Sequence, residues 1–297
     1  DGDTLTYLVV AGPSHGMLSG SGANRTYTPA ADFNGSDTFT FKVNDGSVDS
    51  LTAVVKITVT PVNDAPRFDL PSSSVTVAED AGSQVIAGFA ANILPGPPTA
   101  VDESSQTVAF TVVVTSTTGG LTFATAPAIA PDGTLTFRAA PNSNGTATLS
   151  VFLTDSGSGV APDVNASPPR SVTLAVTPVN DAPTLGPIGD LVVNQDASSQ
   201  TVSLIGVTAG PANESTQALT ITAVSSNPGL IPDPSASYTS PLSTGLLTFA
   251  PTPGATGTAV ITVTVRDDGG TAGGGVDTVT RTFTVTVAPS SQLLTAD

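Results

Sequence analysis

Apolar and polar residues alternate along most of the chain, so that every second side chain falls on the same face of an extended backbone. Residues 38–43 read Thr-Phe-Thr-Phe-Lys-Val and place Phe39, Phe41 and Val43 on one face. Such alternation, rich in β-branched and aromatic residues, is typical of half-buried strands. The same pattern predicts strands over residues 51–60, 148–154, 171–177, 259–265 and 280–287. No segment has the spacing of a convincing amphipathic helix, so the sequence predicts an all-β protein.

Three landmarks recur along the chain, and such repetition indicates a tandem architecture. The hexapeptide Pro-Val-Asn-Asp-Ala-Pro begins at Pro61 and again at Pro178, 117 residues later. An aromatic residue, a Gly eight positions later and an Asp ten positions after that Gly occur in three sets: Tyr27, Gly35 and Asp45; Phe137, Gly145 and Asp155; Phe249, Gly257 and Asp267. Residues 102–106 and 77–80 also match residues 213–217 and 193–196. The landmarks predict three homologous domains, the first without its N-terminal part.

Several short strands per repeat favour tandem immunoglobulin-like or cadherin-like Greek-key β-sandwiches over a closed barrel. We expect a partial sandwich over residues 1–62, complete sandwiches over residues 67–179 and 184–289, and a linker or tail over residues 290–297. The boundaries fall at the Asn-Asp-Ala-Pro segments because Pro blocks the continuation of a strand.

Charge and composition exclude several classes of function. The chain has 297 residues with 24 Asp and Glu against 8 Lys and Arg, a formal net charge of −16, so it lacks the basic surface that nucleic-acid binding needs. It contains no Cys, which excludes a disulfide scaffold and a thiolate metal site. No apolar run approaches the roughly 18 residues of a membrane span, so we expect no direct membrane insertion in this segment.

Nothing in the sequence predicts an enzyme. Residues 12–16 fit the Gly-x-Ser-x-Gly pattern, but a nucleophile elbow needs a strand–turn–helix context and a separate His as base. His15 is the only His of the chain, and it directly follows Ser14 in a segment rich in Gly and Pro. A hairpin turn explains these residues better than a catalytic site does.

Several motifs together resemble the bacterial cadherin-like tandem repeats of very large surface and secreted proteins. They lie at residues 1–7, 13–16, 27–29, 32–39 (Asp-Phe-Asn-Gly-Ser-Asp-Thr-Phe), 44–46 and 62–66. The resemblance implies stacked Greek-key sandwiches, calcium at the junctions between them, and a location outside the cell or on its surface. It also implies neighbouring repeats of the same chain as partners, with a cell-surface protein or a glycan as a further partner. Residues 67–289 are similar to a more divergent branch of this group.

Calcium takes six to eight oxygen ligands from carboxylates, carbonyl groups and water, and no single loop of this chain supplies so many. Segments that converge at a junction can supply them. At the first junction the candidate ligands are Asp32, Asp37, Asn63, Asp64, Asp102, Glu103 and Asp155. At the second junction, which is poorer in carboxylates, they are Glu79, Asn180, Asp181, Asn213, Glu214 and Asp267. The residues Asp1, Asp3 and Asp45 would serve a junction with a preceding domain.

Simpler interpretations of the same residues stay open. The Asn-Asp-Ala-Pro segment is also a good turn, because Asn and Asp bond their own backbone and Pro ends the strand. Asp45, Asp155 and Asp267 would then only shape hairpin turns. Residues 288–291 lack an Asn-Asp pair, so either the array ends there or the next junction is free of metal.

The sequence therefore predicts a calcium-stiffened spacer or adhesive segment of a large extracellular surface protein, and no enzyme. The alternative is an ancillary spacer or glycan-binding module of a secreted multidomain enzyme or toxin. A catalytic domain elsewhere in the parent protein would favour this alternative.

Overall fold

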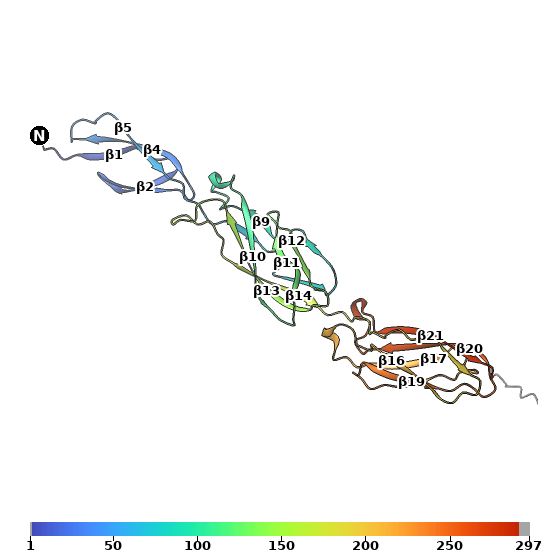
Figure 1. Ribbon diagram of the computed structural model, residues 1–297. Helices are drawn as coiled ribbons and strands as arrows, with labels where there is room; N and C mark the ends of the chain where they lie inside the picture. Colours follow the sequence, from blue (N-terminus) through green and yellow to red (C-terminus); the bar gives the residue numbers. More distant parts are fainter. Residues whose placement is uncertain (1, 291–297) are drawn as a thin grey trace, which may run out of the picture. The chain divides into compact units, whose positions relative to one another are not determined.

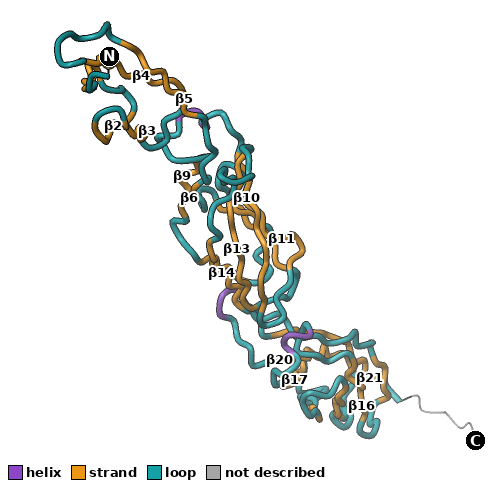
Figure 2. Tube along the Cα trace, turned by 90° about the vertical axis from the view of Figure 1, so that its left-hand side faces the viewer, coloured by secondary structure: helices purple, strands orange, loops and turns teal. Residues whose placement is uncertain are grey.

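Strands make up nearly all the regular structure of the computed structural model, which describes residues 2–290. Within these residues the helical structure is limited to short 3-10 turns, drawn in purple among the orange strands in Figure 2. The predicted all-β class is confirmed. Asp1 and all of the expected tail except residue 290 lie outside the described residues. No helix in the described range is long and apolar enough to span a membrane.

The chain divides into two compact units. One comprises Asp1–Thr76, Gly82–Arg138 and Thr146–Ala175, and the other comprises Val77–Ala81, Ala139–Gly145 and Val176–Asp297. In chain order the strands form three sets (Figure 1), which we name the first repeat (β1–β5), the second repeat (β6–β14) and the third repeat (β15–β21). No strand crosses residues 60–66 or 178–183, which contain the two Asn-Asp-Ala-Pro segments. The domain boundaries expected there stay a prediction.

The first repeat has two small sheets. One sheet has the order β1-β4-β5, and β2 pairs with β3 in the other. The strands are β1 (Thr6–Ala11), β2 (Gly16–Ser21), β3 (Asn24–Pro29), β4 (Gly35–Asn44) and β5 (Ala53–Val59). In the antiparallel ladder of β4 and β5, Phe39 lies opposite Val55 and Asp37 lies opposite Ile57.

The second repeat is a β-sandwich with sheets of order β10-β13-β14-β7 and β11-β12-β8, and β6 pairs with β9 beside them. Its strands are β6 (Arg67–Asp69), β7 (Ser74–Ala78), β8 (Gln84–Ile86), β9 (Ala91–Leu94), β10 (Val108–Thr117), β11 (Phe123–Ile129), β12 (Leu135–Ala139), β13 (Gly145–Asp155) and β14 (Arg170–Thr177). The 3-10 turn η1 (Val101–Glu103) precedes β10.

The third repeat is a sandwich of the same plan, with sheets of order β15-β21-β20-β17 and β16-β19-β18. Its elements are β15 (Leu191–Asn194), β16 (Gln200–Ile205), η2 (Ala212–Glu214), β17 (Thr220–Ser225), β18 (Ser235–Ser237), β19 (Thr244–Phe249), β20 (Gly257–Arg266), η3 (Ala272–Gly274) and β21 (Thr278–Ala288). The strand β15 runs parallel to β21, whereas β20 and β21 are antiparallel. All six segments predicted as strands from their alternation fall on strands of the structure.

Burial differs between the repeats at matching positions of their central strands. Three inward-facing side chains are fully buried in each of the later repeats: Leu149, Val151 and Leu153 in β13, and Ile261, Val263 and Val265 in β20. The first repeat has Phe39, Phe41 and Val43 at these positions of β4, and all three are only partly buried. The cores of the second and third repeats are therefore closed, and the core of the first repeat is open.

Candidate functional site: two acidic clusters at the Asn-Asp linkers

The two Asn-Asp-Ala-Pro segments, residues 63–66 and 180–183, are the first and second linkers. The side chain of Asn63 holds the first linker in place. Its Nδ2 donates to Asp155 Oδ1 at 3.1 Å and to the carbonyl oxygen of Val164 at 2.9 Å. Its Oδ1 accepts a hydrogen bond from Gln106 Nε2 at 2.6 Å. Strand pairing ends before the linker, so these side-chain hydrogen bonds hold the linker in place. We name Asn63, Asp64, Glu103, Gln106 and Asp155 the first cluster.

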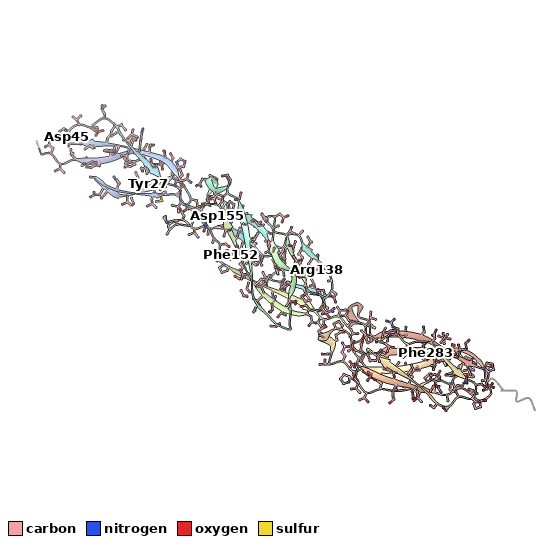
Figure 3. All side chains as sticks on the ribbon, in the orientation of Figure 1. Tyr27, Asp45, Arg138, Phe152, Asp155 and Phe283 are labelled. Atoms are coloured by element: carbon pink, nitrogen blue, oxygen red, sulfur yellow. The ribbon has the colours of Figure 1, made fainter. Side chains whose placement is uncertain are left out.

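Buried oxygen atoms without a partner distinguish this cluster from an ordinary turn. Glu103, on η1, is 2% exposed, and its Oε1 accepts from the backbone N–H of Asp64 at 2.6 Å. Asp155, at the end of β13 (labelled in Figure 3), accepts from the Gly157 N–H through Oδ1 at 2.7 Å. The other oxygen of each carboxylate, and Oε1 of Gln106, are buried and have no hydrogen-bond partner. Buried polar atoms are nearly always satisfied in folded proteins, so such a group calls for a physical reason.

The second linker repeats this geometry atom for atom. Asn180 Nδ2 donates to Asp267 Oδ1 at 3.0 Å, and Gln217 Nε2 donates to Asn180 Oδ1 at 2.7 Å. Glu214 Oε1 accepts from the backbone N–H of Asp181 at 2.8 Å. The remaining oxygens of Glu214, Asp267 and Gln217 are again buried without a partner. These five residues form the second cluster, and the repetition shows that the unsatisfied oxygens are a regular feature of the repeat.

Two glycines, Gly157 and Gly269, leave room for the side chains of Asn63 and Asn180 against the main chain that follows β13 and β20. A Cβ atom on Gly157 would overlap the side-chain amide of Asn63, and one on Gly269 would overlap that of Asn180. Gly is therefore required at both positions for close approach, even though neither has a positive φ.

Mutual repulsion of charges is evident in the first cluster. Burial raises the pKa of the Glu103 carboxyl, and the hydrogen bond from the Asp64 N–H only partly opposes this rise. The charges of Asp64, Asp102 and Asp155 raise the pKa of Glu103 further. Burial also raises the pKa of Asp64, and the charges of Asp32 and Asp102 add to that rise. The site thus disfavours its own negative charge and would gain from a cation.

The second cluster behaves in the same way. Burial raises the pKa of the Glu214 carboxyl, with further rises from the charges of Asp181, Asp267 and Glu79. Burial raises the pKa of Asp181 as well, followed by the charges of Asp80 and Glu79. Glu79 is 3% exposed and accepts hydrogen bonds from the backbone N–H of Val179 and from Asn144 Nδ2, so it lies beside the second linker.

Comparison with known proteins identifies the type of the repeat. Residues 1–58 match the family model described as bacterial Ig domain. The first repeat is thus similar to a bacterial immunoglobulin-like domain. This confirms the resemblance to bacterial repeats of the immunoglobulin-like and cadherin-like kind. The sheets of the second and third repeats contain counterparts of all five strands of the first repeat and two further strands each.

Several solved structures are similar to the chain over most of its length. Mouse protocadherin-24 EC1-3 is 14% identical with a TM-score of 0.43, covering 96% of this chain and 91% of that one. Drosophila N-cadherin EC1-4 is 14% identical with a TM-score of 0.38, covering 97% and 68%. An endo-fucoidan hydrolase of glycoside hydrolase family 107 is 15% identical with a TM-score of 0.28, covering 97% and 39%. At such low scores these likenesses carry no argument. No curated protein matches the chain in sequence.

The structure brings most of the predicted ligands to the two clusters. Asp32 bonds to the Thr99 hydroxyl, and its charge acts on Asp64. Asp102 is exposed beside the first cluster, and Asn213 is exposed on η2 next to Glu214. Asp32 has a positive φ of 58°, as has Asn142 with 52° and Gly254 with 75° at the matching positions before β13 and β20.

Asp37 is not part of the first cluster, because its carboxylate is bonded within the first repeat. Its carboxylate is 4% exposed and accepts hydrogen bonds from the backbone N–H groups of Ser14, His15 and Thr38 and from the hydroxyl of Tyr27. Burial would raise the pKa of this carboxyl, but the four donors outweigh burial and lower the pKa from 3.8 to about 2. Because both oxygens are already satisfied within the first repeat, we leave Asp37 out of the ligand set proposed below.

The depressed pKa of Asp37 predicts acid sensitivity of the first repeat. A carboxylate whose pKa is lower in the folded state stabilises the fold above its unfolded pKa and loses this effect as pH falls toward the folded value. We expect Asp37→Asn to destabilise the first repeat at pH 7 and the difference from the parent chain to vanish near pH 2. Thermal melts between these pH values, with Asp3→Asn at an exposed position as control, measure it. Parallel pH profiles of the Asp37→Asn variant and the parent would contradict the assignment.

The interpretation of the Asp residues as turn formers is half right. Asp45 Oδ1 accepts the N–H groups of Ser47 and Val48 and so closes a hairpin turn. Asp155 and Asp267 also close a turn, but only through Oδ1. Their Oδ2 atoms stay buried and unpartnered, so one carboxylate serves both purposes.

Sequence reasoning missed Gln106, Gln217 and Asp80. The two Gln residues occupy the same place in the recurring segments 102–106 and 213–217, so the repeat itself was the available signal. Asp80 follows Glu79 directly, bonds to the backbone N–H of Asn142 at 3.1 Å and acts on the pKa of Asp181.

The donor chemistry of both clusters fits calcium. Among the described residues, no group of three or more His, Cys, Asp and Glu side chains is arranged to hold a metal ion. Calcium, however, also takes amide and backbone carbonyl oxygens, and all donors here are oxygens. The orphaned atoms comprise one Glu, one Asp and one Gln oxygen per cluster. Such a set suits a hard cation and excludes the soft metals that prefer thiolates.

Proposed function

We propose that the chain is a segment of a large extracellular repeat protein, and that calcium binds at both acidic clusters and stiffens the Asn-Asp linkers. The observation that carries the proposal is the duplicated set of buried, unpartnered oxygens on Glu103 and Asp155 and on Glu214 and Asp267. A turn motif alone leaves these atoms unexplained.

Each linker contributes an Asp to the proposed donor set and an Asn that positions its neighbours. The first set comprises Asp32, Asp64, Asp102, Glu103, Gln106 and Asp155; the second comprises Glu79, Asp80, Asp181, Glu214, Gln217 and Asp267. Asn63 and Asn180 act mainly as positioning residues, because both ends of each amide are already bonded within the cluster.

Calcium would neutralise carboxylates that repel one another in its absence. Without the cation, repulsion favours opening of the linker, where water can solvate the charges. With it, the linker, the 3-10 turn and the end of the central strand share one ion and move together. Many such linkers in series would make a stiff spacer, which suits a role in reaching or adhering to another surface.

Calorimetry with calcium and with chelator tests the proposal. Extracellular calcium modules bind at about 10⁻⁴ to 10⁻³ M, so about 10 mM calcium should stabilise each site by about 1.4–2.7 kcal/mol. We expect higher melting temperatures and, by small-angle scattering, reduced interdomain motion. Magnesium should give a weaker response, because it needs a tighter octahedral site. Superimposable curves in calcium and chelator would remove calcium from the proposal.

A double substitution tests the choice of ligands. Asp32→Ala with Asp64→Ala removes two of the interacting charges of the first cluster, so we expect the calcium response of this cluster to disappear. The second cluster, which contains neither Asp32 nor Asp64, is unchanged in this variant and is the internal control. A full calcium response at both clusters would show that other groups bind the ion.

A further inference from the structure

The first repeat lacks strands that the later repeats place beside matching neighbours. In the second repeat β7 borders β14 and β8 borders β12; in the third repeat β15 borders β21 and β16 borders β19. In the first repeat, β5 corresponds to β14 and β21, and β3 corresponds to β12 and β19. Within residues 2–290 the outer edges of β5 and β3 pair with no strand. Open strand edges of this kind are templates for an added strand.

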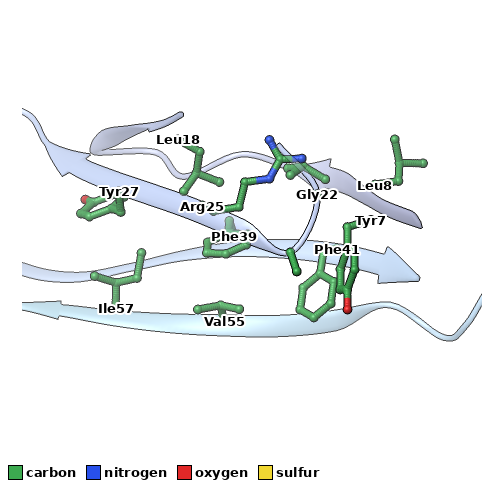
Figure 4. A pocket seen from close by; sticks show the side chains of 12 residues that line it. Tyr7, Leu8, Leu18, Gly22, Arg25, Tyr27, Phe39, Phe41, Val55 and Ile57 are labelled. Carbon is green, nitrogen blue, oxygen red and sulfur yellow. The ribbon is translucent and has the colours of Figure 1, made fainter. Parts of the chain in front are cut away.

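An apolar groove follows these open edges. It has a volume of about 380 Å³ and lies between the two sheets of the first repeat. Figure 4 shows side chains from both sheets directed toward this space, among them Tyr27, Phe39, Phe41, Val55 and Ile57. The residues that match Phe39 and Phe41 are 0% exposed in both later repeats, so the groove is an uncovered core.

A second hollow marks where the missing segment would end. In the second repeat, Glu79 directly follows β7 and accepts hydrogen bonds from the Val179 N–H at 2.7 Å and from Asn144 Nδ2 at 3.0 Å. The matching donors of the first repeat are the Val62 N–H and the Asn34 side chain. In the described part of the chain neither has a hydrogen-bond partner, and both residues line a hollow of about 240 Å³.

A third donor points to the same absent segment. Asp80 accepts from the backbone N–H of Asn142 at 3.1 Å, and Asp196 accepts from that of Gly254 at 2.7 Å. The matching N–H in the first repeat belongs to Asp32. No acceptor for it is found among residues 2–290. Three unpaired donors thus lie where the later repeats bind a Glu-Asp or Gln-Asp pair.

We propose that the groove of the first repeat is a strand acceptor whose occupant precedes β1 in the same polypeptide. The occupant is a segment of two short strands with alternating apolar residues. The first of these strands lies beside β5 and ends in an acidic pair seated on Val62, Asn34 and Asp32. The source follows from chain order, because β7 and β8 precede β10, and β15 and β16 precede β17. A small apolar ligand would leave the three donors and both strand edges unpaired.

A graft taken from the second repeat tests this assignment. Residues 73–107, which contain β7, β8 and η1, are placed directly before Leu5, because Leu5 of the first repeat matches Val108. Amide hydrogen exchange followed by NMR in chelator keeps calcium out of the experiment. We expect exchange at the N–H groups of Lys56 and Val62 to slow by about tenfold or more, because an added strand protects the edge of its neighbour.

Two control grafts separate strand docking from mere extension of the chain. Val75→Asp with Val77→Asp in the graft places charges on its apolar face and should abolish the protection of Lys56. Glu79→Ala in the graft should keep the protection of Lys56 and lose that of Val62. Exchange in the unaltered graft as fast as in the parent chain would overturn the proposal.

Measurements on the parent chain guard against a graft that fails to fold. A peptide of residues 73–88, added in trans, should shift the resonances of Phe39, Phe41 and Val55 in a saturable way. No shift at millimolar peptide would count against the acceptor groove. Protection of Lys56 that increases with the concentration of the parent chain alone would identify a second copy as the occupant and overturn the assigned source.

Discussion

The substitution Glu103→Gln is expected to have opposite effects on the first cluster in chelator and in calcium. In chelator the variant should melt at a higher temperature than the parent, and its calcium affinity should fall by about tenfold or more, which corresponds to about 1.4 kcal/mol. Gln keeps an oxygen for the backbone N–H of Asp64 and has the size of Glu. The change therefore removes charge without leaving a cavity.

The higher melting temperature expected in chelator follows from the raised pKa of Glu103. Burial and three neighbouring charges make the ionised form unfavourable in the folded state, so a neutral side chain relieves the repulsion. The lower calcium affinity follows because the substitution removes from the donor set a carboxylate oxygen that faces no protein donor. A purely structural Glu would lower stability under both conditions.

Titration calorimetry and melting curves in both conditions measure the effect. Glu214→Gln should reproduce it at the second cluster, because Glu214 has the same partners there. The control is Asp132→Asn, an exposed carboxylate of the second repeat that accepts from the Thr134 N–H and belongs to neither donor set. Its effect on affinity should be clearly smaller. An unchanged calcium response of both Gln variants would refute the proposed ligands.

Replacing Asn63 by Ala should release the first linker and cost about 2–4 kcal/mol of local stability. The substitution leaves Asp155 Oδ1, the Val164 carbonyl and Gln106 Nε2 each short of one partner. An unsatisfied buried polar group costs about 1–3 kcal/mol, and nearby water recovers part of the sum. Asn180→Ala should have a similar effect, because its bonds to Asp267 and Gln217 match those of Asn63.

Hydrogen exchange of the Val164 N–H measures this release, because that group donates to the carbonyl oxygen of Asn63 at 2.9 Å. The corresponding probe in the second cluster is the Val276 N–H, which donates to the carbonyl of Asn180. The control is Val62→Ala, since the adjacent Val62 side chain is 44% exposed. If Asn63→Ala and Val62→Ala speed exchange equally, the side-chain amide does not hold the linker.

The strands could be predicted from the sequence because an apolar residue at every second position lines one face of an extended chain and no face of a helix. The clusters could be predicted in outline because Asn63, Glu103 and Asp155 recur as Asn180, Glu214 and Asp267 at corresponding places in the repeats. A residue that recurs beside a linker and carries an oxygen ligand is a good candidate even when its contacts are unknown.

The role of Asp37 could not be predicted in the same way. Its neighbours in sequence are Ser36 and Thr38, and it differs little from an acid in an exposed loop. Its main partners, the N–H groups of Ser14 and His15, come from a distant turn, and only tertiary structure brings them together. The unpaired oxygens were likewise beyond the sequence, because a pattern shows which groups recur and not which of their atoms remain unsatisfied.

The left-handed backbone position before the long central strand differs in charge between the first repeat and the later two. Asp32, Asn142 and Gly254 occupy it in turn, with φ between 52° and 75°. Asp, Asn and Gly are the residues that tolerate this conformation best. Exchanges among the three therefore leave the main chain almost undisturbed while they add or remove one unit of charge. If calcium binds at the linkers as we propose, such exchanges would give an array a graded series of hinges that stiffen at different calcium concentrations, while every sandwich stays the same.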